Sequence, residues 1–127
     1  MRFFLISIIL VVFSTGSLAS EAIDLRHKGV EAASKGDFET AQKFLGQSAK
    51  LGFYTAQVEY AYLLESSPES VKNNAESYAW YQVVIARNGT DTEFAKDGLS
   101  RLMKTMPDEE LQQAKEITIK YIKLYAK

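Results

Sequence analysis

One spacing of small and large apolar residues occurs twice along this chain, and in each copy it has the period of paired α-helices. The first copy comprises Ala41, Phe44, Ala49, Gly52, Ala56, Tyr60, Ala61 and Leu64. The second comprises Ser77, Trp80, Ile85, Gly89, Ala95, Leu99, Ser100 and Met103. Small residues let paired helices approach closely, and a glycine separates the two helices of each copy. The spacing predicts stacked helical hairpins, an architecture that usually binds other proteins rather than catalysing reactions.

The periodicity predicts an all-α domain of about six helices. The expected ranges are about 23–34, 38–51, 54–65, 75–87 and 92–104, with a last helix that begins near Pro107 and includes Tyr125. Gly36, Gly52 and the pair Asn88-Gly89 lie where helices should end, because glycine and asparagine adopt the left-handed conformation found there. Most large apolar residues are expected to face inward. The residues expected to face inward include Ile23, Val30, Phe94 and Met103, and Ser100 is expected at a close contact between helices.

The first nineteen residues have the pattern of a secretory signal peptide. Arg2 supplies a positive charge, residues 3–13 are apolar apart from Ser7, and small residues precede the expected cleavage after Ala19. An uncleaved membrane anchor is the alternative, but this apolar run is shorter than the roughly 20 residues that span a bilayer. We expect a signal peptide over 1–19, a mature domain over 20–127, export to the periplasm or the medium, and no stable membrane insertion after cleavage.

Composition argues against several classes of function. The formal net charge is −1, which leaves no basic surface for nucleic acid. The chain contains no cysteine, so neither disulfides nor thiol chemistry are expected. His27 is the single histidine and has no metal-binding partner at a suitable spacing. We therefore expect no catalytic residues, no metal site and no cofactor.

The two copies resemble sel-one-like repeats, a branch of the tetratricopeptide-type helical hairpins. The residues that carry the resemblance are Ala41 to Leu45 and Ser48 to Gly52 in the first copy, and Tyr78-Ala79-Trp80-Tyr81 in the second. The second copy departs from the family pattern because Trp80 and Gly89 are one residue further apart. Either Asn88 takes the role of the glycine or the helix is one residue longer. The resemblance implies a short right-handed α-solenoid of about three hairpins that serves as a protein-interaction scaffold, often in the bacterial envelope.

The sequence hypothesis is an exported interaction module that binds a peptide or protein segment in a groove of the helical repeat. Glu59, Tyr62 and Tyr78 are the candidate protein-binding residues, since tyrosine combines a large contact area with a hydrogen-bonding tip. For the two tyrosines, partial burial against the neighbouring hairpin is the alternative. One alternative is a small envelope enzyme or ligand-binding protein that acts on a cell-wall component. Another is a self-associating structural module, which would form a homodimer.

Overall fold

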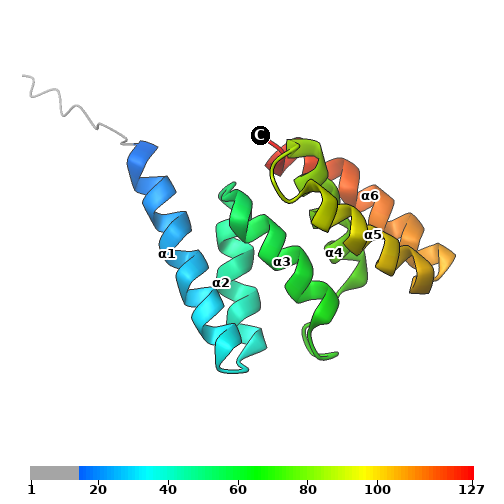
Figure 1. Ribbon diagram of the computed structural model, residues 1–127, viewed down its shortest axis with the longest axis horizontal. Coiled ribbons are helices and arrows are strands. Elements are labelled where there is room, and N and C mark those ends of the chain that lie inside the picture. Colours follow the sequence, from blue (N-terminus) through cyan, green and yellow to red (C-terminus); the bar gives the residue numbers. More distant parts are fainter. Residues whose placement is uncertain (1–14) are drawn as a thin grey trace, which may run out of the picture.

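The computed structural model describes residues 15–127, which form six α-helices and no strand (Figure 1). The helices are α1 (Thr15–Ser34), α2 (Phe38–Lys50), α3 (Tyr54–Ser66), α4 (Asn74–Arg87), α5 (Thr92–Thr105) and α6 (Asp108–Tyr125). The predicted all-α class is therefore confirmed over the described residues, and only the start of α1 differs by more than a residue or two. The expected cleavage after Ala19 falls within α1, whereas the earlier part of the predicted signal peptide lies outside the described residues.

Helix ends follow the predicted turn residues. Gly36 and Gly52 have φ angles of 79° and 91°, a conformation that side chains disfavour. After α4 it is Asn88, with a φ of 51°, that adopts the left-handed conformation. Asn88 therefore takes the role that glycine holds in the first copy. Gly89 has a different role: a Cβ at this position would lie 2.6 Å from the Tyr54 ring, so glycine allows the turn to approach α3.

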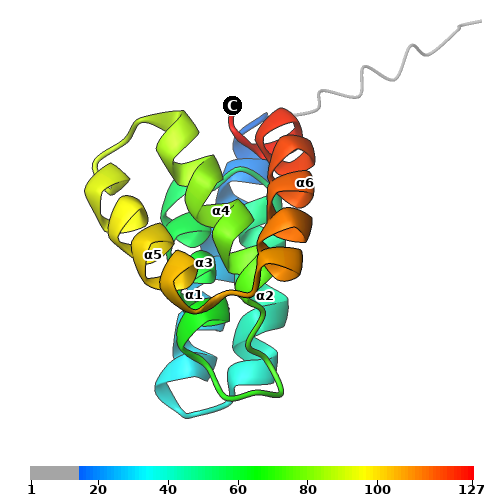
Figure 2. The same cartoon turned by 90° about the vertical axis from the view of Figure 1, so that its right-hand side faces the viewer.

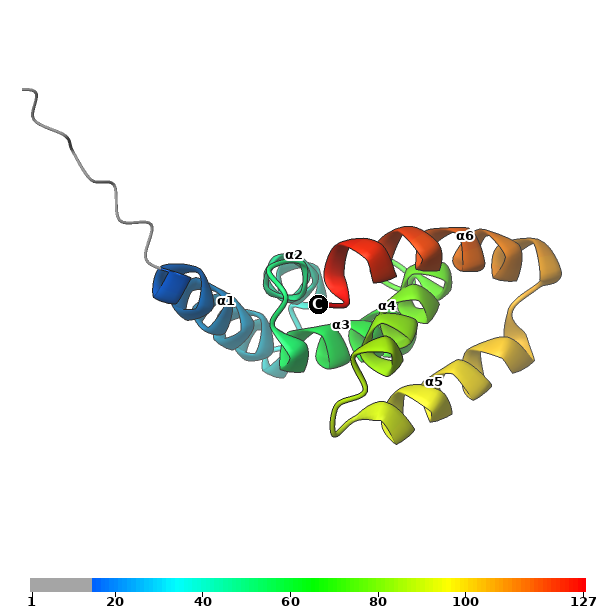
Figure 3. The same ribbon diagram turned by 90° about the horizontal axis from the view of Figure 1, so that it is seen from above.

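Helix α4 is the centre of the C-terminal half. It packs against α3, α5 and α6, and α5 and α6 lie on opposite sides of it (Figures 2 and 3). Trp80 and Tyr81 are completely buried because three other helices pack against α4. The last helix thus packs along α4 rather than against α5, its neighbour in sequence. The right-handed solenoid arrangement stays a prediction.

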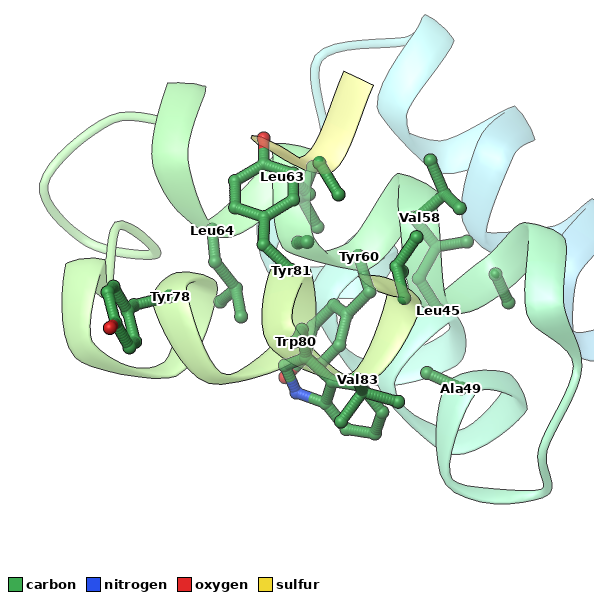
Figure 4. Packing of buried hydrophobic residues seen from close by; sticks show 14 of the residues in the cluster. Leu45, Ala49, Val58, Tyr60, Leu63, Leu64, Tyr78, Trp80, Tyr81 and Val83 are labelled. Carbon is green, nitrogen blue, oxygen red and sulfur yellow. The ribbon is translucent and has the colours of Figure 1, made fainter. Parts of the chain in front are cut away.

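Aromatic side chains fill the space between α4 and its neighbours. The Trp80 ring centroid lies 5.7 Å from that of Tyr60 on α3, and 5.2 and 5.0 Å from those of Tyr121 and Tyr125 on α6. Figure 4 shows Tyr60 and Trp80 side by side in this core. The Tyr121 hydroxyl donates a 2.6 Å hydrogen bond to the Glu76 carboxylate. These contacts attach α6 to α4.

Small residues hold the N-terminal helices together. Ala41 and Ala49 of α2 are fully buried, and a Cβ at Gly29 of α1 would lie only 2.7 Å from Cγ of Leu45. The Ser48 hydroxyl is buried between the two helices and donates a 2.6 Å hydrogen bond to the Ala22 carbonyl. Helices α1 and α2 therefore approach at a distance that larger side chains would prevent.

Several side chains that were predicted to be buried are exposed. Those expected inside but exposed are Ile23, Val30, Phe94, Met103 and Ser100. The physical reason is that α1 and α5 each have few neighbouring helices. The main packing partner of α1 is α2, and that of α5 is α4, so each of these helices buries only a narrow stripe. Apolar residues at the edge of the stripe remain accessible.

Candidate interaction groove

An apolar groove runs between α1 and α3, with α2 as its floor. We call it the α1–α3 groove. It encloses about 320 Å³. Its main lining residues are Val30 and Ala33 of α1, Phe38 and Leu45 of α2, and Glu59 and Tyr62 of α3. Helices α1 and α3 both pack against α2, and Val30 and Ala33 are too short to fill the space between them.

An ion pair joins the two walls of this groove. The Arg26 guanidinium of α1 donates two hydrogen bonds through Nε and Nη2 to the Glu59 carboxylate of α3, the Nε–Oε2 distance being 2.9 Å. The hydrogen bond to Glu59 also raises the pKa of Arg26, although partial burial opposes the change. Both side chains are partly buried, so their charges neutralise one another at the groove wall. Glu59, predicted as a binding residue, thus helps to fix the spacing of α1 and α3.

Tyr62 is the most accessible aromatic residue of the groove, with half of its surface exposed. Its ring makes an edge-to-face contact with Phe94 of α5, with ring centroids 5.9 Å apart. The pair extends the apolar surface from the α1–α3 groove across α3 to α5. An exposed aromatic pair beside a preformed depression is typical of surfaces that bind other proteins.

Tyr78, the third predicted binding residue, lies elsewhere. Its side chain is only 5% exposed, and its hydroxyl accepts a 3.3 Å hydrogen bond from the Gln82 amide within α4. Figure 4 shows Tyr78 among the buried residues of α4. Helix α4 is covered on three sides, so even a position beside the expected inner stripe becomes buried. The structure therefore brings Glu59 and Tyr62 together but does not place Tyr78 with them.

Three residues of this surface were not predicted to be accessible or to line it: Val30, Phe38 and Phe94. A valine or phenylalanine that faces a groove has the same helical spacing as one that faces the core. The sequence pattern gives no signal that separates the two cases. Only the absence of a further helix above α1, α2 and α3, among the residues that the structure describes, leaves these side chains accessible.

A second charged network ties α3, α4 and α5 together away from the groove. The Glu65 carboxylate accepts a 2.7 Å hydrogen bond from the Tyr81 hydroxyl and a 2.8 Å hydrogen bond from Arg101 Nε. Burial tends to raise the pKa of Glu65, but the hydrogen bonds from Arg101 and Tyr81 outweigh this and lower it. Burial and the hydrogen bond to Glu65 raise the pKa of Tyr81. Each polar group has its partner, which indicates a structural role.

No family model, curated protein or solved structure matches the chain. The resemblance to sel-one-like repeats therefore stays a prediction from residue spacing. Within residues 15–127, no helix is both long enough and apolar enough to cross a membrane. His27 is exposed on α1, and the described residues hold no group of three His, Asp or Glu side chains arranged for a metal ion.

Proposed function

We propose that this protein is an interaction module that binds a segment of another protein in the α1–α3 groove. The observation that carries the proposal is a preformed apolar depression on three consecutive helices, with the half-exposed Tyr62 at its edge. A preformed surface binds with little loss of conformational entropy. Export to the envelope and membership of the sel-one-like repeats, both suggested by sequence patterns, are part of the same proposal.

The size and chemistry of the groove favour side chains of a protein over a small molecule. Its volume of about 320 Å³ is at the lower end of the range for small-molecule sites, roughly 300–1,000 Å³. Such sites also present several convergent polar groups. Here the carboxylate of Glu59 is engaged by Arg26, and the Ser66 hydroxyl donates to the Tyr62 carbonyl. The remaining lining is almost entirely apolar, which suits leucine-like or aromatic side chains.

Selection of peptides from a random displayed library tests this proposal directly, because it does not require the partner to be identified first. We expect the selected peptides to change the amide chemical shifts of Val30, Phe38 and Tyr62 in nuclear magnetic resonance spectra of the protein. Tyr62→Ala should weaken binding about tenfold or more, as expected for an aromatic anchor. Met103→Ala is the matched control, since Met103 is equally exposed but lies on α5 outside the groove.

Two results would contradict the proposal. One is that no peptide is enriched above background. The other is that enriched peptides shift only residues outside the groove and bind Tyr62→Ala as well as they bind the unchanged protein. Because Tyr62 is half exposed, the variant is expected to fold, and its far-ultraviolet circular dichroism provides the check.

A further inference from the structure

Asn88 and Gly89 begin the turn between α4 and α5, and this pair of residues can react with itself. The backbone nitrogen of a residue that follows asparagine is able to attack the side-chain amide carbon and close a five-membered ring. Glycine in the second position favours the attack most, because it has no side chain to hinder it. Asn88, Gly89 and Thr90 are all exposed, so water and hydroxide reach the two reacting groups.

The reacting groups are free of competing hydrogen bonds. The Asn88 backbone N–H donates to the Ile85 carbonyl at 3.0 Å and ends α4. Among residues 15–127, neither the Asn88 side chain nor the Gly89 N–H makes a hydrogen bond. Neither group therefore has to give up a partner before the ring closes.

The folded turn nevertheless holds the two groups apart. Asn88 adopts the left-handed conformation, with a φ of 51° and a ψ of 45°. At this ψ the Asn88 Cβ and the Gly89 nitrogen lie on opposite sides of the Cα–C bond that joins them. Ring closure requires rotation about this bond, which moves Gly89 and the residues after it. The reaction therefore proceeds only when the turn opens.

Tyr54 of α3 keeps the turn closed. A Cβ at Gly89 would lie 2.6 Å from the Tyr54 ring, and the Tyr54 hydroxyl accepts a 2.8 Å hydrogen bond from the Asp91 N–H. The Arg87 guanidinium lies 5.4 Å from the centroid of the same ring. Any residue larger than glycine after Asn88 would displace this ring. The contact with Tyr54 thus requires the reactive pair and also limits its reaction.

We propose that Asn88 is a site of spontaneous modification whose rate is set by Tyr54. When the turn opens, the Gly89 nitrogen loses its proton to hydroxide and attacks Asn88 Cγ. A bond forms between these two atoms, the bond from Cγ to the side-chain nitrogen breaks, and that nitrogen takes a proton and leaves as ammonia. Water then opens the succinimide ring at either of its carbonyl carbons, which gives aspartate or isoaspartate with no change in oxidation state.

Both products alter the junction between α3 and α4. Each places a carboxylate at the C-terminal end of α4, where the helix dipole disfavours negative charge. Isoaspartate also adds a carbon atom to the main chain within a turn that already touches the Tyr54 ring. The modified turn therefore no longer fits against Tyr54 as the original turn does.

Two other positions serve as internal controls. Aspartate before glycine forms the same ring with loss of water, but Asp97 and Gly98 lie inside α5, where the Gly98 N–H donates within the helix. The Asn73 side-chain oxygen accepts a 3.0 Å hydrogen bond from the Glu76 N–H at the start of α4. We expect Asn88 to react well before Asp97 or Asn73.

Incubation of the purified protein in mildly alkaline buffer tests the proposal. Peptide mapping by tandem mass spectrometry locates the gain of one mass unit, and an isoaspartate-specific methyltransferase identifies the isoaspartate. A synthetic peptide of residues 84–94 provides the rate without the fold. We expect the protein to be modified at Asn88, and to react more slowly than the peptide because its turn is closed.

Two conservative substitutions test the role of Tyr54. Tyr54→Phe removes the hydroxyl that binds Asp91 and should accelerate the reaction roughly threefold to tenfold, the size expected for the loss of one hydrogen bond. Tyr121→Phe is the matched control, because it removes a hydrogen bond to Glu76 on α4 and leaves the turn intact. Its rate should equal that of the unchanged protein. Equal rates for the two variants would overturn the control by Tyr54.

The remaining outcomes decide whether Asn88 is the site. If Asn88 stays unmodified after the peptide has converted completely, the site is overturned. Reaction of Asp97 at the same rate as Asn88 would overturn the importance of the turn. Asn88→Gly keeps a residue suited to the left-handed conformation and should abolish the mass gain, whereas a gain that persists would place the reaction elsewhere. These outcomes are independent of the α1–α3 groove.

Discussion

The N-terminal and C-terminal halves of this protein have a similar residue spacing, but they differ in what lies above the first large residue of each copy. Phe44 and Trp80 hold the same repeat position. Trp80 is fully buried between α3 and α6. Phe44 is only partly buried, and the ammonium groups of Lys28 and Lys43 lie 5.7 and 5.5 Å from its ring centroid. A residue at this position therefore enters the core only where another helix covers it.

The same difference explains where the candidate site lies. In the C-terminal half, α6 supplies Tyr121 and Tyr125 to the surface of α4. In the N-terminal half, no helix of the described chain covers the space between α1 and α3, which remains as the α1–α3 groove. The groove thus lies where no further helix of the described residues packs onto α1 and α3.

The largest predicted effect is the difference between Trp80→Ala and Phe44→Ala. Removal of the buried indole leaves a cavity among three tyrosine rings and should lower the free energy of unfolding by about 3–5 kcal/mol. Phe44→Ala should cost about 1 kcal/mol, because water and lysine side chains already contact the ring. Urea unfolding followed by circular dichroism measures both. Similar losses for the two variants would show that Phe44 and Trp80 are equally well packed.

Gly98→Ala tests the close packing of the C-terminal half. A Cβ at Gly98 on α5 would lie 2.4 Å from the ring of Tyr81, which is fully buried and hydrogen bonded to Glu65. The ring has no room to move, so we expect a loss of about 1–3 kcal/mol in urea unfolding. Ser100→Ala, at an exposed position of the same helix, should change stability by less than about 0.5 kcal/mol. Equal stability of Gly98→Ala and the unchanged protein would refute this view of the α4–α5 contact.

The aromatic core of the C-terminal half also predicts sensitivity to alkali. Burial raises the pKa of Tyr60 to about 12, above the ordinary tyrosine value of about 10. The folded state therefore holds this proton more tightly than the unfolded state does. Its contribution to stability is complete below about pH 10 and is lost as the pH rises toward 12. Burial raises the pKa of Tyr81 and Tyr121 in the same direction.

Phenolate absorbance and circular dichroism, recorded together during an alkaline titration, measure this effect. Unfolding should accompany the appearance of phenolate. Tyr60→Phe, which removes one raised group, should shift the unfolding midpoint to higher pH. A titration in which the tyrosines ionise near their ordinary pKa of about 10 without loss of helix would show that these rings are not held in a closed core.

The helices and their ends could be predicted from the sequence because they depend on local properties. Helical periodicity locates all six helices of residues 15–127, and the left-handed preference of asparagine allows Asn88 to replace a glycine. The residue pattern of one helix does not reveal how many other helices surround it. For that reason Tyr78 on α4, a candidate binding residue, is buried, and Val30 on α1 is exposed where burial was predicted. Of the candidate site, only Glu59 and Tyr62 were predicted from the sequence. The groove itself could not be predicted, because it stays open only if α6 packs against α4 and leaves α1 and α3 uncovered.

Tyr62→Ala is expected to lower the stability of the fold only slightly. Half of the ring is already in water, and its edge contact with Phe94 is the main interaction that truncation removes. We expect a loss of at most about 1 kcal/mol in urea unfolding, far below that of Trp80→Ala. If the loss approached that of Trp80→Ala, Tyr62 would be part of the core and its exposed face a consequence of packing. A small loss would instead show that the stability of this fold does not depend on an aromatic ring at the edge of the groove.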